Sequence, residues 1–388
     1  LQEGLKFLVN KYCDRFQNDI SPDPAIVEPF SLVVDKTSWE TSRNLLGPRK
    51  MDRTRSEECQ RQITELLEKG ILEVSNASYF SHALMVPKPN KKWRFCIDFT
   101  NLNQSTQKES WPIPNIQVML KRIGEKRPNF FIVLDLTSGY FQMPISEESR
   151  IYTAFITQTG LYQWKRLPMG LKGAPSYFQK TLSTQILNGL LMNVCELYLD
   201  DLIIYSTTKD QLLDSFEKIL IRFRQFNILI NPTKCKLGME EVTYVGHTIN
   251  RNGIHFTRAR LDGIMNIRLP QTQKELKSFL GVANFFHNHV KNHSIIAKPL
   301  NEMLSDYVKS KKLVWTEEKE ESFHLLKQAV NECPQLFFLD DNSPIHLYTD
   351  ASELGIGAHL TQVVDGKENS IGFISKSFDK RMKNWDVP

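Results

Sequence analysis

The chain lacks any long apolar run. No stretch of its 388 residues approaches the roughly 18 consecutive apolar residues that a membrane-spanning helix needs, and no signal peptide opens it. Cysteine is scarce and no Cys-x-x-Cys spacing occurs; the six cysteines are at positions 13, 59, 96, 195, 235 and 333. These absences argue against a membrane span and a disulfide framework, and they predict a soluble intracellular protein with reduced thiols.

Neither sign of charge dominates the composition. The formal net charge is +5, and the contents of 41% hydrophobic and 24% charged residues are ordinary for a globular protein. The length suggests two or three domains. The positive excess is local, because residues 251–312 hold eleven Lys or Arg against four Asp or Glu. Cations clustered in this way suit phosphate binding, while a solvated helix face is the alternative.

Two adjacent carboxylates interrupt an apolar stretch at Cys195–Tyr205, where Asp200 and Asp201 separate two runs that have the composition of strands. This pattern predicts a β-hairpin with both acids in its turn, where neither carboxylate is neutralised by burial. Such a turn would attract a cation. Side chains alternate along a strand, so we expect the two acids to have unequal environments.

A third carboxylate, Asp135, ends the apolar run that begins at Phe130 and is followed by a turn at Gly139. We expect a buried central strand that carries Asp135 at its carboxyl end. Carboxylates on separate strands can hold two Mg²⁺ ions roughly 4 Å apart, which is the arrangement for two-metal phosphoryl transfer. The combination predicts a polymerase palm, although a lone Asp-Asp pair would be read as a solvated turn.

Several motifs, in order, resemble the reverse transcriptase of gypsy-type LTR retrotransposons. They are RQITELLEKGI at 61–71, KWRFCIDFTNLN at 92–103, residues 131–141, LPMGLKGAPSYFQ at 167–179, YLDD at 198–201, YVGH at 244–247 and FLGVANFF at 279–286. The resemblance implies an α+β right-hand polymerase with fingers, palm and thumb. It also implies that Asp135, Asp200 and Asp201 are catalytic metal ligands, that the backbone carbonyl of Leu136 is a further ligand, and that Mg²⁺ is the metal, with Mn²⁺ as a substitute.

The fingers are expected to begin with an amphipathic helix from Ser56, closed by Gly70. Two strands, Phe80–Val86 and Trp93–Ile97, would then form a hairpin around a basic tip. That tip is suited to a triphosphate, and the resemblance supports Lys88 and Arg94 as the residues that bind it. A solvated basic turn is the alternative.

Three more residues are expected at the nucleotide. Tyr140 matches the aromatic residue that lies beneath the sugar in reverse transcriptases, where its ring would exclude a 2′-hydroxyl; a core tyrosine is the alternative. Met169 and Gly170 belong to a loop that, in the resembled family, packs against the incoming nucleotide. Met169 stands where retroviral relatives usually carry Gln, so its contact would be apolar.

Residues 242–249 resemble the primer-grip hairpin that positions the growing 3′ end, with Tyr244, Val245, Gly246 and His247 as the grip. Apolar residues at helical spacing then predict a thumb helix over 274–286, with its basic side toward a duplex. The histidines that follow, at 287, 289 and 293, are expected to be exposed rather than to bind zinc, since no cysteine or carboxylate completes such a site.

From about Pro344 the pattern predicts three antiparallel strands, which resemble the opening sheet of a ribonuclease H domain with Asp350 as its first metal ligand. One carboxylate cannot hold two Mg²⁺ ions, so this chain is not expected to cut RNA. Because residue 1 is Leu, we expect a processed product or a piece of a polyprotein that also carries protease, ribonuclease H and integrase segments.

The resulting prediction has four parts: a linker over 1–47, fingers and palm over 48–250, thumb and connection over 251–335, and a partial ribonuclease H-like domain over 336–388. The predicted function is RNA-directed DNA polymerisation with RNA template, DNA primer, RNA/DNA hybrid and deoxynucleoside triphosphates as partners. The predicted location is the cytoplasm, in virus-like particles, with the nucleus as an alternative. A silent nucleic-acid-binding remnant of a retroelement is one alternative function. A nucleotide cyclase is another, but it would not need a primer grip or a basic thumb.

Overall fold

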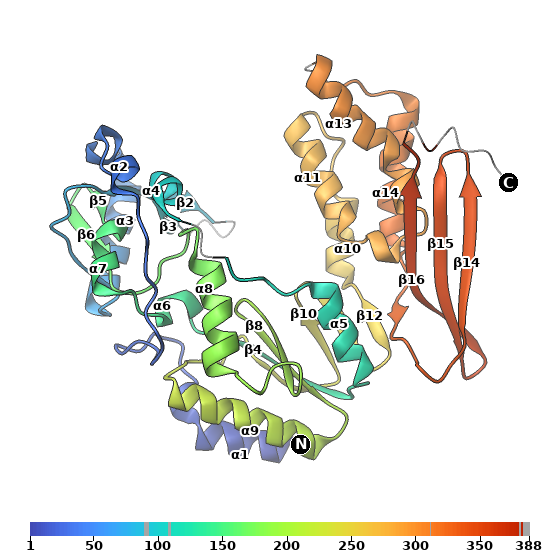
Figure 1. Ribbon diagram of the computed structural model, residues 1–388, viewed down its shortest axis with the longest axis horizontal. Coiled ribbons are helices and arrows are strands. Elements are labelled where there is room, and N and C mark those ends of the chain that lie inside the picture. Colours follow the sequence, from blue (N-terminus) through green and yellow to red (C-terminus); the bar gives the residue numbers. More distant parts are fainter. Residues whose placement is uncertain (89–92, 108–109, 311, 380–381, 383–388) are drawn as a thin grey trace. The chain divides into compact units, whose positions relative to one another are not determined.

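The computed structural model describes residues 1–88, 93–107, 110–310, 312–379 and 382 (Figure 1). The chain divides into two compact units. The first unit consists of residues 1–120 and 129–239, and the second of residues 121–128 and 240–388. Among the described residues, no helix is both long and apolar enough to cross a membrane.

A four-stranded antiparallel sheet forms the centre of the first unit. Its order is β7-β8-β4-β9, with bounds Cys195–Tyr198, Asp201–Ser206, Phe130–Asp135 and Lys236–Met239. The two middle strands are rich in buried apolar side chains, which explains their continuous hydrophobic runs. The helix α9 (Lys209–Gln225) packs on β4 and β8, and α8 (Ala174–Thr181) continues into a π-helical turn at Leu182–Ile186.

The fingers elements form a second sheet in the same unit, of order β1-β6-β5-β2-β3. The strand bounds are Leu72–Val74, Gly160–Trp164, Phe155–Thr157, Ser81–Pro87 and Trp93–Asp98. The predicted helix is α3 (Arg53–Glu68); the Asp52 side chain caps its start, and Gly70 follows its end with a φ of +65°. The expected helix and the expected β2–β3 pair are both confirmed. Shorter elements are α2 (Lys36–Trp39), α4 (Thr100–Ser105), α6 (Gly139–Gln142) and α7 (Glu147–Arg150), with 3₁₀ turns at 13–15, 42–45 and 151–153.

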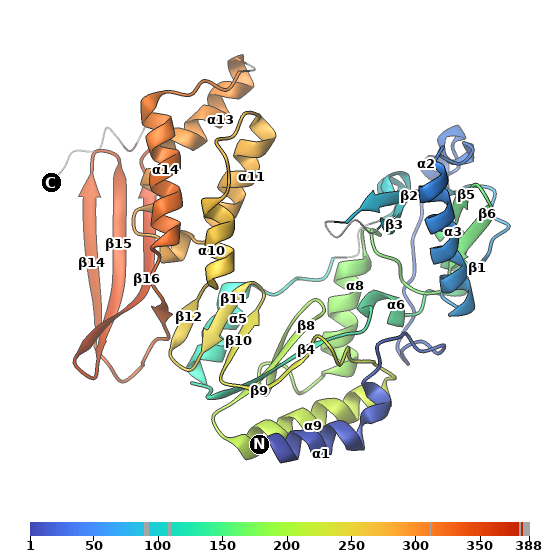
Figure 2. The same ribbon diagram turned by 180° about the vertical axis from the view of Figure 1, so that it is seen from behind.

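The expected linker over residues 1–47 is instead part of the core of the first unit. The helix α1 (Gln2–Lys11) lies beside α9 in both views (Figures 1 and 2), and Leu5, Leu8 and Tyr12 are buried. The prolines of this segment suggested a linker, but apolar residues before, between and after them are buried in the hydrophobic core, among them Ala25, Phe30 and Trp39. The helix α1 ends at Lys11.

The second unit contains a small antiparallel sheet and a helical core. The sheet order is β10-β11-β12-β13, with bounds Glu241–Tyr244, His247–Asn250, Gly253–His255 and Leu336–Phe337. The helices are α10 (Arg258–Met265), α11 (Gln273–Asn284), α12 (His293–Ile296), α13 (Lys298–Ser310) and α14 (Glu317–Asn331). The predicted thumb helix is α11, which starts with a capping box between Thr272 and Glu275 and buries Leu276 and Phe279. The helix α5 (Ile116–Glu125) crosses the sequence boundary between the two units.

Three long antiparallel strands complete the second unit, as predicted. They are β14 (Ile345–Ser352), β15 (Gly355–Val364) and β16 (Lys367–Ser377), joined in chain order. Every residue of β14 is exposed, whereas β16 packs against α12.

Candidate active site

The candidate site is built where β4 ends and β8 begins. In the antiparallel pairing of these strands, Asp135 is directly opposite Asp201. Residues that face each other in this way project from the same side of a sheet, with Cβ atoms roughly 5 Å apart. The turn between β7 and β8 consists of Leu199 and Asp200, so Asp201 is the first residue of β8 rather than part of the turn. The sheet therefore brings the three predicted carboxylates to the same end of its two middle strands.

The two adjacent acids have different environments, as expected. Asp200 is exposed in the turn, whereas Asp201 is half-buried. Burial raises the pKa of the Asp201 carboxyl, and the negative charges of Asp200 and Asp135 raise it further. The expectation that both acids lie in the turn is therefore wrong for Asp201, because this residue begins β8 and is half-buried. A positive charge at this edge would reverse the effect.

One cation of the chain already lies at the site. The ammonium Nζ of Lys234 is 3.2 Å from Oδ1 and 3.4 Å from Oδ2 of Asp135, so this carboxylate accepts a positive partner. Hard oxygen ligands of this kind suit Mg²⁺. Leu136 and Ile230 form an isolated antiparallel β-bridge. The hydrogen bonds of this bridge are made by the residues on either side of the two, so the carbonyl of Leu136 accepts none of them.

The residues present fit a divalent metal in kind. In the described part of the chain, however, no three His, Cys, Asp or Glu side chains gather closely enough to form a ready-made metal cluster. Asp200 is exposed, so its side chain has room to adopt other rotamers.

A residue without a predicted role holds the turn. Gln179 of α8 is 1% exposed, and its Oε1 accepts a hydrogen bond of 2.7 Å from the backbone N–H of Leu199. Its Nε2 donates to the carbonyl of Leu197 at 3.4 Å and to Oγ of Ser183 at 3.1 Å. Leu199 has a φ of +54°, a conformation that a non-glycine residue seldom adopts without support. Gln179 closes the quoted motif at 167–179, but only the fold shows what it contacts.

Tyr140 lies close to the carboxylates. It is in α6, half-buried, and its ring stacks on Phe178 with centroids 4.7 Å apart and an interplanar angle of 13°. Burial raises the pKa of Tyr140 to about 12, and the negative charge of Asp200 contributes to the shift. A Cβ atom at Gly139 would be 3.0 Å from the Phe178 ring, so a small residue there permits the stacking. The ring is therefore fixed beside the predicted metal ligands.

The other predicted nucleotide-binding residues belong to the fingers and to the loop before α8. Arg94 is exposed on β3, opposite Val86, and the positive charges of Arg94 and Lys88 both act on the thiol of Cys96. Because both charges act on the same thiol, the two cations lie near each other around Cys96. Lys91 and Lys92, the other cations of the predicted tip, lie outside the described residues. Among the described residues, no contact joins Arg94 or Lys88 to the carboxylates.

The loop before α8 is held to the fingers by Asn103. Its Nδ2 donates to the carbonyl of Gly170 at 2.8 Å, and its Oδ1 accepts from the backbone N–H of Lys172 at 2.7 Å. Gly170 has a φ of +99°, which favours glycine. Met169 is 61% exposed, so its side chain is available for an apolar contact.

Comparison with known proteins decides the family. Residues 86–249 match the family model "Reverse transcriptase (RNA-dependent DNA polymerase)", and residues 315–387 match "RNase H-like domain found in reverse transcriptase". Residues 86–249 are a reverse transcriptase domain. The resemblance predicted from the motifs is thus confirmed, as is the presence of a partial ribonuclease H-like domain.

The relatives are retrotransposon polyproteins. The chain is 34% identical over 341 residues to the Retrovirus-related Pol polyprotein from transposon opus of Drosophila melanogaster, covering 84% of this chain and 34% of the relative. It is 32% identical to the polyprotein from transposon 297 of the same organism, covering 85% and 31%, and 28% identical to the Transposon Tf2-3 polyprotein of Schizosaccharomyces pombe, covering 84% and 24%. The chain thus spans at most about a third of the length of these relatives.

Solved structures confirm the α+β polymerase fold. The foamy viral protease-reverse transcriptase in complex with RNA/DNA hybrid has a TM-score of 0.79 at 24% identity, covering 98% of this chain and 50% of that one. The dRH form in complex with ds DNA has a TM-score of 0.82 at 24% identity, covering 98% and 66%. The other predicted domain boundaries stay predictions. The match to the ribonuclease H-like family begins at 315, whereas the predicted boundary is at 336.

The predicted primer grip of the reverse transcriptase domain is a tight hairpin. Tyr244 and His247 pair at the ends of β10 and β11, and the turn between them is Val245–Gly246, with φ values of +45° and +79°. The side chains of Tyr244 and His247 are 2% and 1% exposed, so only the turn itself can meet a ligand. Burial lowers the pKa of His247 to about 4, and its Nδ1 lies 3.1 Å from the carbonyl of Val245.

Two of the histidines expected to be exposed are buried instead. His289 and His293 are 3% and 6% exposed, whereas His287 is exposed. The ring of His289 packs 4.5 Å from that of Phe256, and burial lowers its pKa to about 3. The expectation failed for His289 because the residues around its ring, among them His247 and Phe256, come from β11 and the segment before α10, which are remote in sequence. The ring of His293 instead lies against α11, with Nε2 3.2 Å from the carbonyl of Ala283.

The ribonuclease H-like strands carry Asp350 on β14, opposite Gly357 and exposed. It lines a hollow with Lys291, Asn292, Tyr348, His359 and Glu368, among others. The carboxylate of Glu368 already accepts hydrogen bonds from the hydroxyls of Tyr348 (2.8 Å) and Thr361 (2.7 Å).

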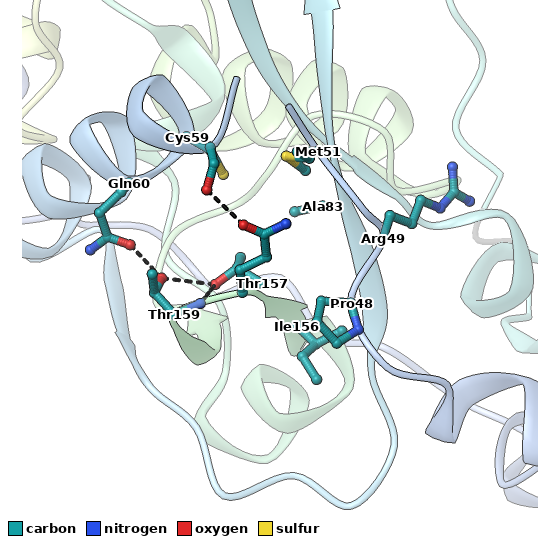
Figure 3. Close-up of a pocket in the computed structure, with 11 residues that line it drawn as sticks. Pro48, Arg49, Met51, Cys59, Gln60, Ala83, Ile156, Thr157 and Thr159 are labelled. Atoms are coloured by element: carbon teal, nitrogen blue, oxygen red, sulfur yellow. Dashed lines mark hydrogen bonds between the residues drawn. The ribbon is translucent and has the colours of Figure 1, made fainter. Parts of the chain in front are cut away.

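A separate small pocket lies between α3 and the fingers sheet (Figure 3). Figure 3 shows Gln60, Thr157 and Thr159 joined by hydrogen bonds around it. Its lining residues include no Asp or Glu and none of the residues predicted for the site. The polar side chains of its rim bond to one another.

Proposed function

We propose that this chain is the RNA-directed DNA polymerase segment of a retrotransposon Pol polyprotein, which adds deoxynucleotides to a primer on an RNA or DNA template. One observation carries the proposal: Asp135 and Asp201 face each other across adjacent strands, with Asp200 in the neighbouring turn and Tyr140 beside them. A carboxyl whose pKa is raised by burial and by neighbouring carboxylates, as that of Asp201 is, is expected where cations and phosphates are to be bound.

In the proposed reaction the three carboxylates and the carbonyl of Leu136 would hold Mg²⁺, with Mn²⁺ as a substitute. Bound metal would supply activation of the primer 3′-hydroxyl and neutralisation of the leaving pyrophosphate. Lys88 and Arg94 bind the triphosphate, and the fixed ring of Tyr140 excludes a 2′-hydroxyl. The grip turn at Val245–Gly246 positions the primer end. The metal-ligand and nucleotide roles rest on the resemblance together with the placement described above.

The proposed partners follow from the same relatives. The foamy viral structures hold RNA/DNA hybrid and ds DNA, and we assign hybrid and duplex as the substrates of this chain by analogy of fold. Protease, ribonuclease H and integrase segments of one polyprotein are proposed companions. The proposed location is the cytoplasm, in virus-like particles, with the nucleus as the second site. Asp350 by itself would not support RNA cleavage.

Primer extension tests the proposal. A labelled DNA primer annealed to a homopolymer RNA template would be incubated with the chain, the complementary deoxynucleotide and Mg²⁺ or Mn²⁺, and a parallel reaction would contain chelator. Extension that needs the metal, the template and the primer supports the proposal. An unextended but bound primer would instead favour the silent nucleic-acid-binding remnant, and release of a cyclic nucleotide without primer would indicate a cyclase.

A further inference from the structure

Arg260 is placed in an unusual way beside the predicted primer-grip turn. It comes from the first turn of α10, and its guanidinium lies over the ring of Phe285, 4.2 Å from the ring centroid. A Cβ atom at Gly246 would be 2.5 Å from Nη1 and 3.0 Å from Cζ of Arg260. The guanidinium therefore packs directly on the backbone of the turn, and glycine is needed there both for its φ and for this approach.

The charge of Arg260 has no carboxylate partner among the described residues. Arg258, two residues earlier on the same helix, pairs with Asp262 at 3.1 Å, so the helix does offer an acid to one of its two arginines. Burial is the cause that lowers the pKa of Arg260, and no acidic neighbour opposes it. A partly desolvated, unpaired guanidinium is costly unless a ligand supplies the negative charge.

The described residues that contact Arg260 carry no negative charge. Arg260 acts on the buried ring of His247, whose pKa is lowered in part by this positive charge. Phe285 offers only its ring face, and that face fixes the plane of the guanidinium. Arg260 itself remains exposed, so its outer N–H groups can be reached from solvent.

We propose that Arg260 binds a phosphodiester of the primer strand, so that the turn at Val245–Gly246 and the guanidinium stacked on Phe285 form one phosphate-binding site. The inference rests on the proposed polymerase function and adds to it a specific residue and ligand. A planar fork held by an aromatic ring loses little further freedom when it grips two phosphate oxygens. Its position against the turn would couple phosphate binding to the conformation of the grip.

The test measures binding of a fluorescent primer–template to the full chain in chelator, without catalysis. Arg260→Gln should raise the Kd roughly tenfold and reduce the slope of log affinity against log salt by about 1. Arg258→Gln is the matched control, because it removes the same charge from the same helix, and it should change the Kd less than twofold. Melting curves of both variants would report any loss of folding.

A scan of single neutral methylphosphonate linkages identifies the ligand. In the wild type, one linkage near the primer 3′ end should weaken binding by about the same factor as Arg260→Gln, and in the Arg260→Gln variant that linkage should have no further effect. Four results would each overturn the inference. The Arg260→Gln variant could be coupled to a linkage of the template strand or to no linkage, both arginine variants could lose the same affinity, or the wild type could fail to bind the duplex. The binding measurements in chelator do not depend on extension. A chain that shows this coupling in chelator, but does not extend a primer when metal is supplied, would therefore refute the proposed function and leave the inference about Arg260 standing.

Discussion

At the scale of single residues, the site combines a few charges whose environments differ sharply. Asp201 is half-buried and carries the repulsion of two other carboxylates, while Asp200 is exposed and Lys234 contacts Asp135. Two uncharged residues support the site. Gln179 holds the turn, and Tyr140 is stacked on Phe178. For each of these two residues, a substitution can distinguish a role in the reaction from a role in packing.

Tyr140 is expected to select the sugar. Replacing it by Val should admit a 2′-hydroxyl, so incorporation of ribonucleotide relative to deoxynucleotide should rise roughly tenfold or more, about 1.4 kcal/mol of discrimination for each tenfold. Tyr140→Phe keeps the ring and should keep the discrimination. The ratio of kcat/KM values for the two nucleotides is the measurement. A ratio unchanged in the Val variant, with both rates lowered, would make Tyr140 a packing residue.

Gln179 is expected to act as a positioning residue. Gln179→Leu leaves the N–H of Leu199 and the carbonyl of Leu197 without this partner, so the turn that carries Asp200 should shift. We expect the single-turnover extension rate to fall by roughly tenfold to a hundredfold while the Kd for primer–template stays unchanged.

The control for this variant is Gln185→Leu in the following π-helical turn, where Oε1 accepts from the backbone N–H of Glu28 near the surface. It should leave the extension rate near that of the wild type. Rates that fall in both variants in proportion to a lowered melting temperature would show that Gln179 only stabilises the fold.

At the scale of elements, the sequence predicts what is local and misses what is distant. The hairpins β7–β8 and β10–β11, the helix α11 and the strands β14–β16 follow from apolar period and turn residues, which neighbours in the chain determine. The packing of residues 1–47, the burial of His289 and the bonds of Gln179 depend on partners far along the chain. Even within one hairpin the prediction has a limit. The turn lies one residue earlier than predicted, so Asp201 belongs to the strand and is half-buried.

The buried histidines of the second unit predict a loss of stability in acid. The pKa of His289 is about 3 and that of His247 about 4, both lowered by burial, whereas the unfolded value is near 6.5. Both rings are neutral when folded, so their contribution is full above about pH 6.5 and is lost as the pH falls toward the folded values. The loss should approach roughly 1.4 kcal/mol per pH unit for each histidine. The charged and titratable neighbours are Arg260, His255 and His287.

Thermal unfolding at pH 7.5 and pH 5.0 checks this expectation. His289→Phe retains an apolar ring against Phe256 and should lose clearly less stability between the two pH values than the wild type does. His287→Phe, at an exposed position, should behave as the wild type. Equal losses in the wild type and in His289→Phe would contradict the assignment.

At the scale of the whole chain, the family, the fold and the order of motifs agree. The chain spans at most about a third of its polyprotein relatives, and its ribonuclease H-like part contributes one exposed candidate ligand, Asp350. The account therefore depends on the carboxylates at the end of β4 and the start of β8. If they hold the metals, removing one charge should stop the reaction without weakening the grip on nucleic acid.

The deciding measurement is the single-turnover rate of primer extension in Mg²⁺ for Asp135→Asn and Asp200→Asn, with primer–template affinity measured in parallel. Each variant should extend at least roughly a thousandfold more slowly than the wild type, because each removes a charge from a shared two-metal site, while the Kd changes little. Asp210→Asn, at an exposed position in the first turn of α9, is the matched control and should extend at the wild-type rate. Near wild-type extension by folded Asp135→Asn or Asp200→Asn would contradict the account.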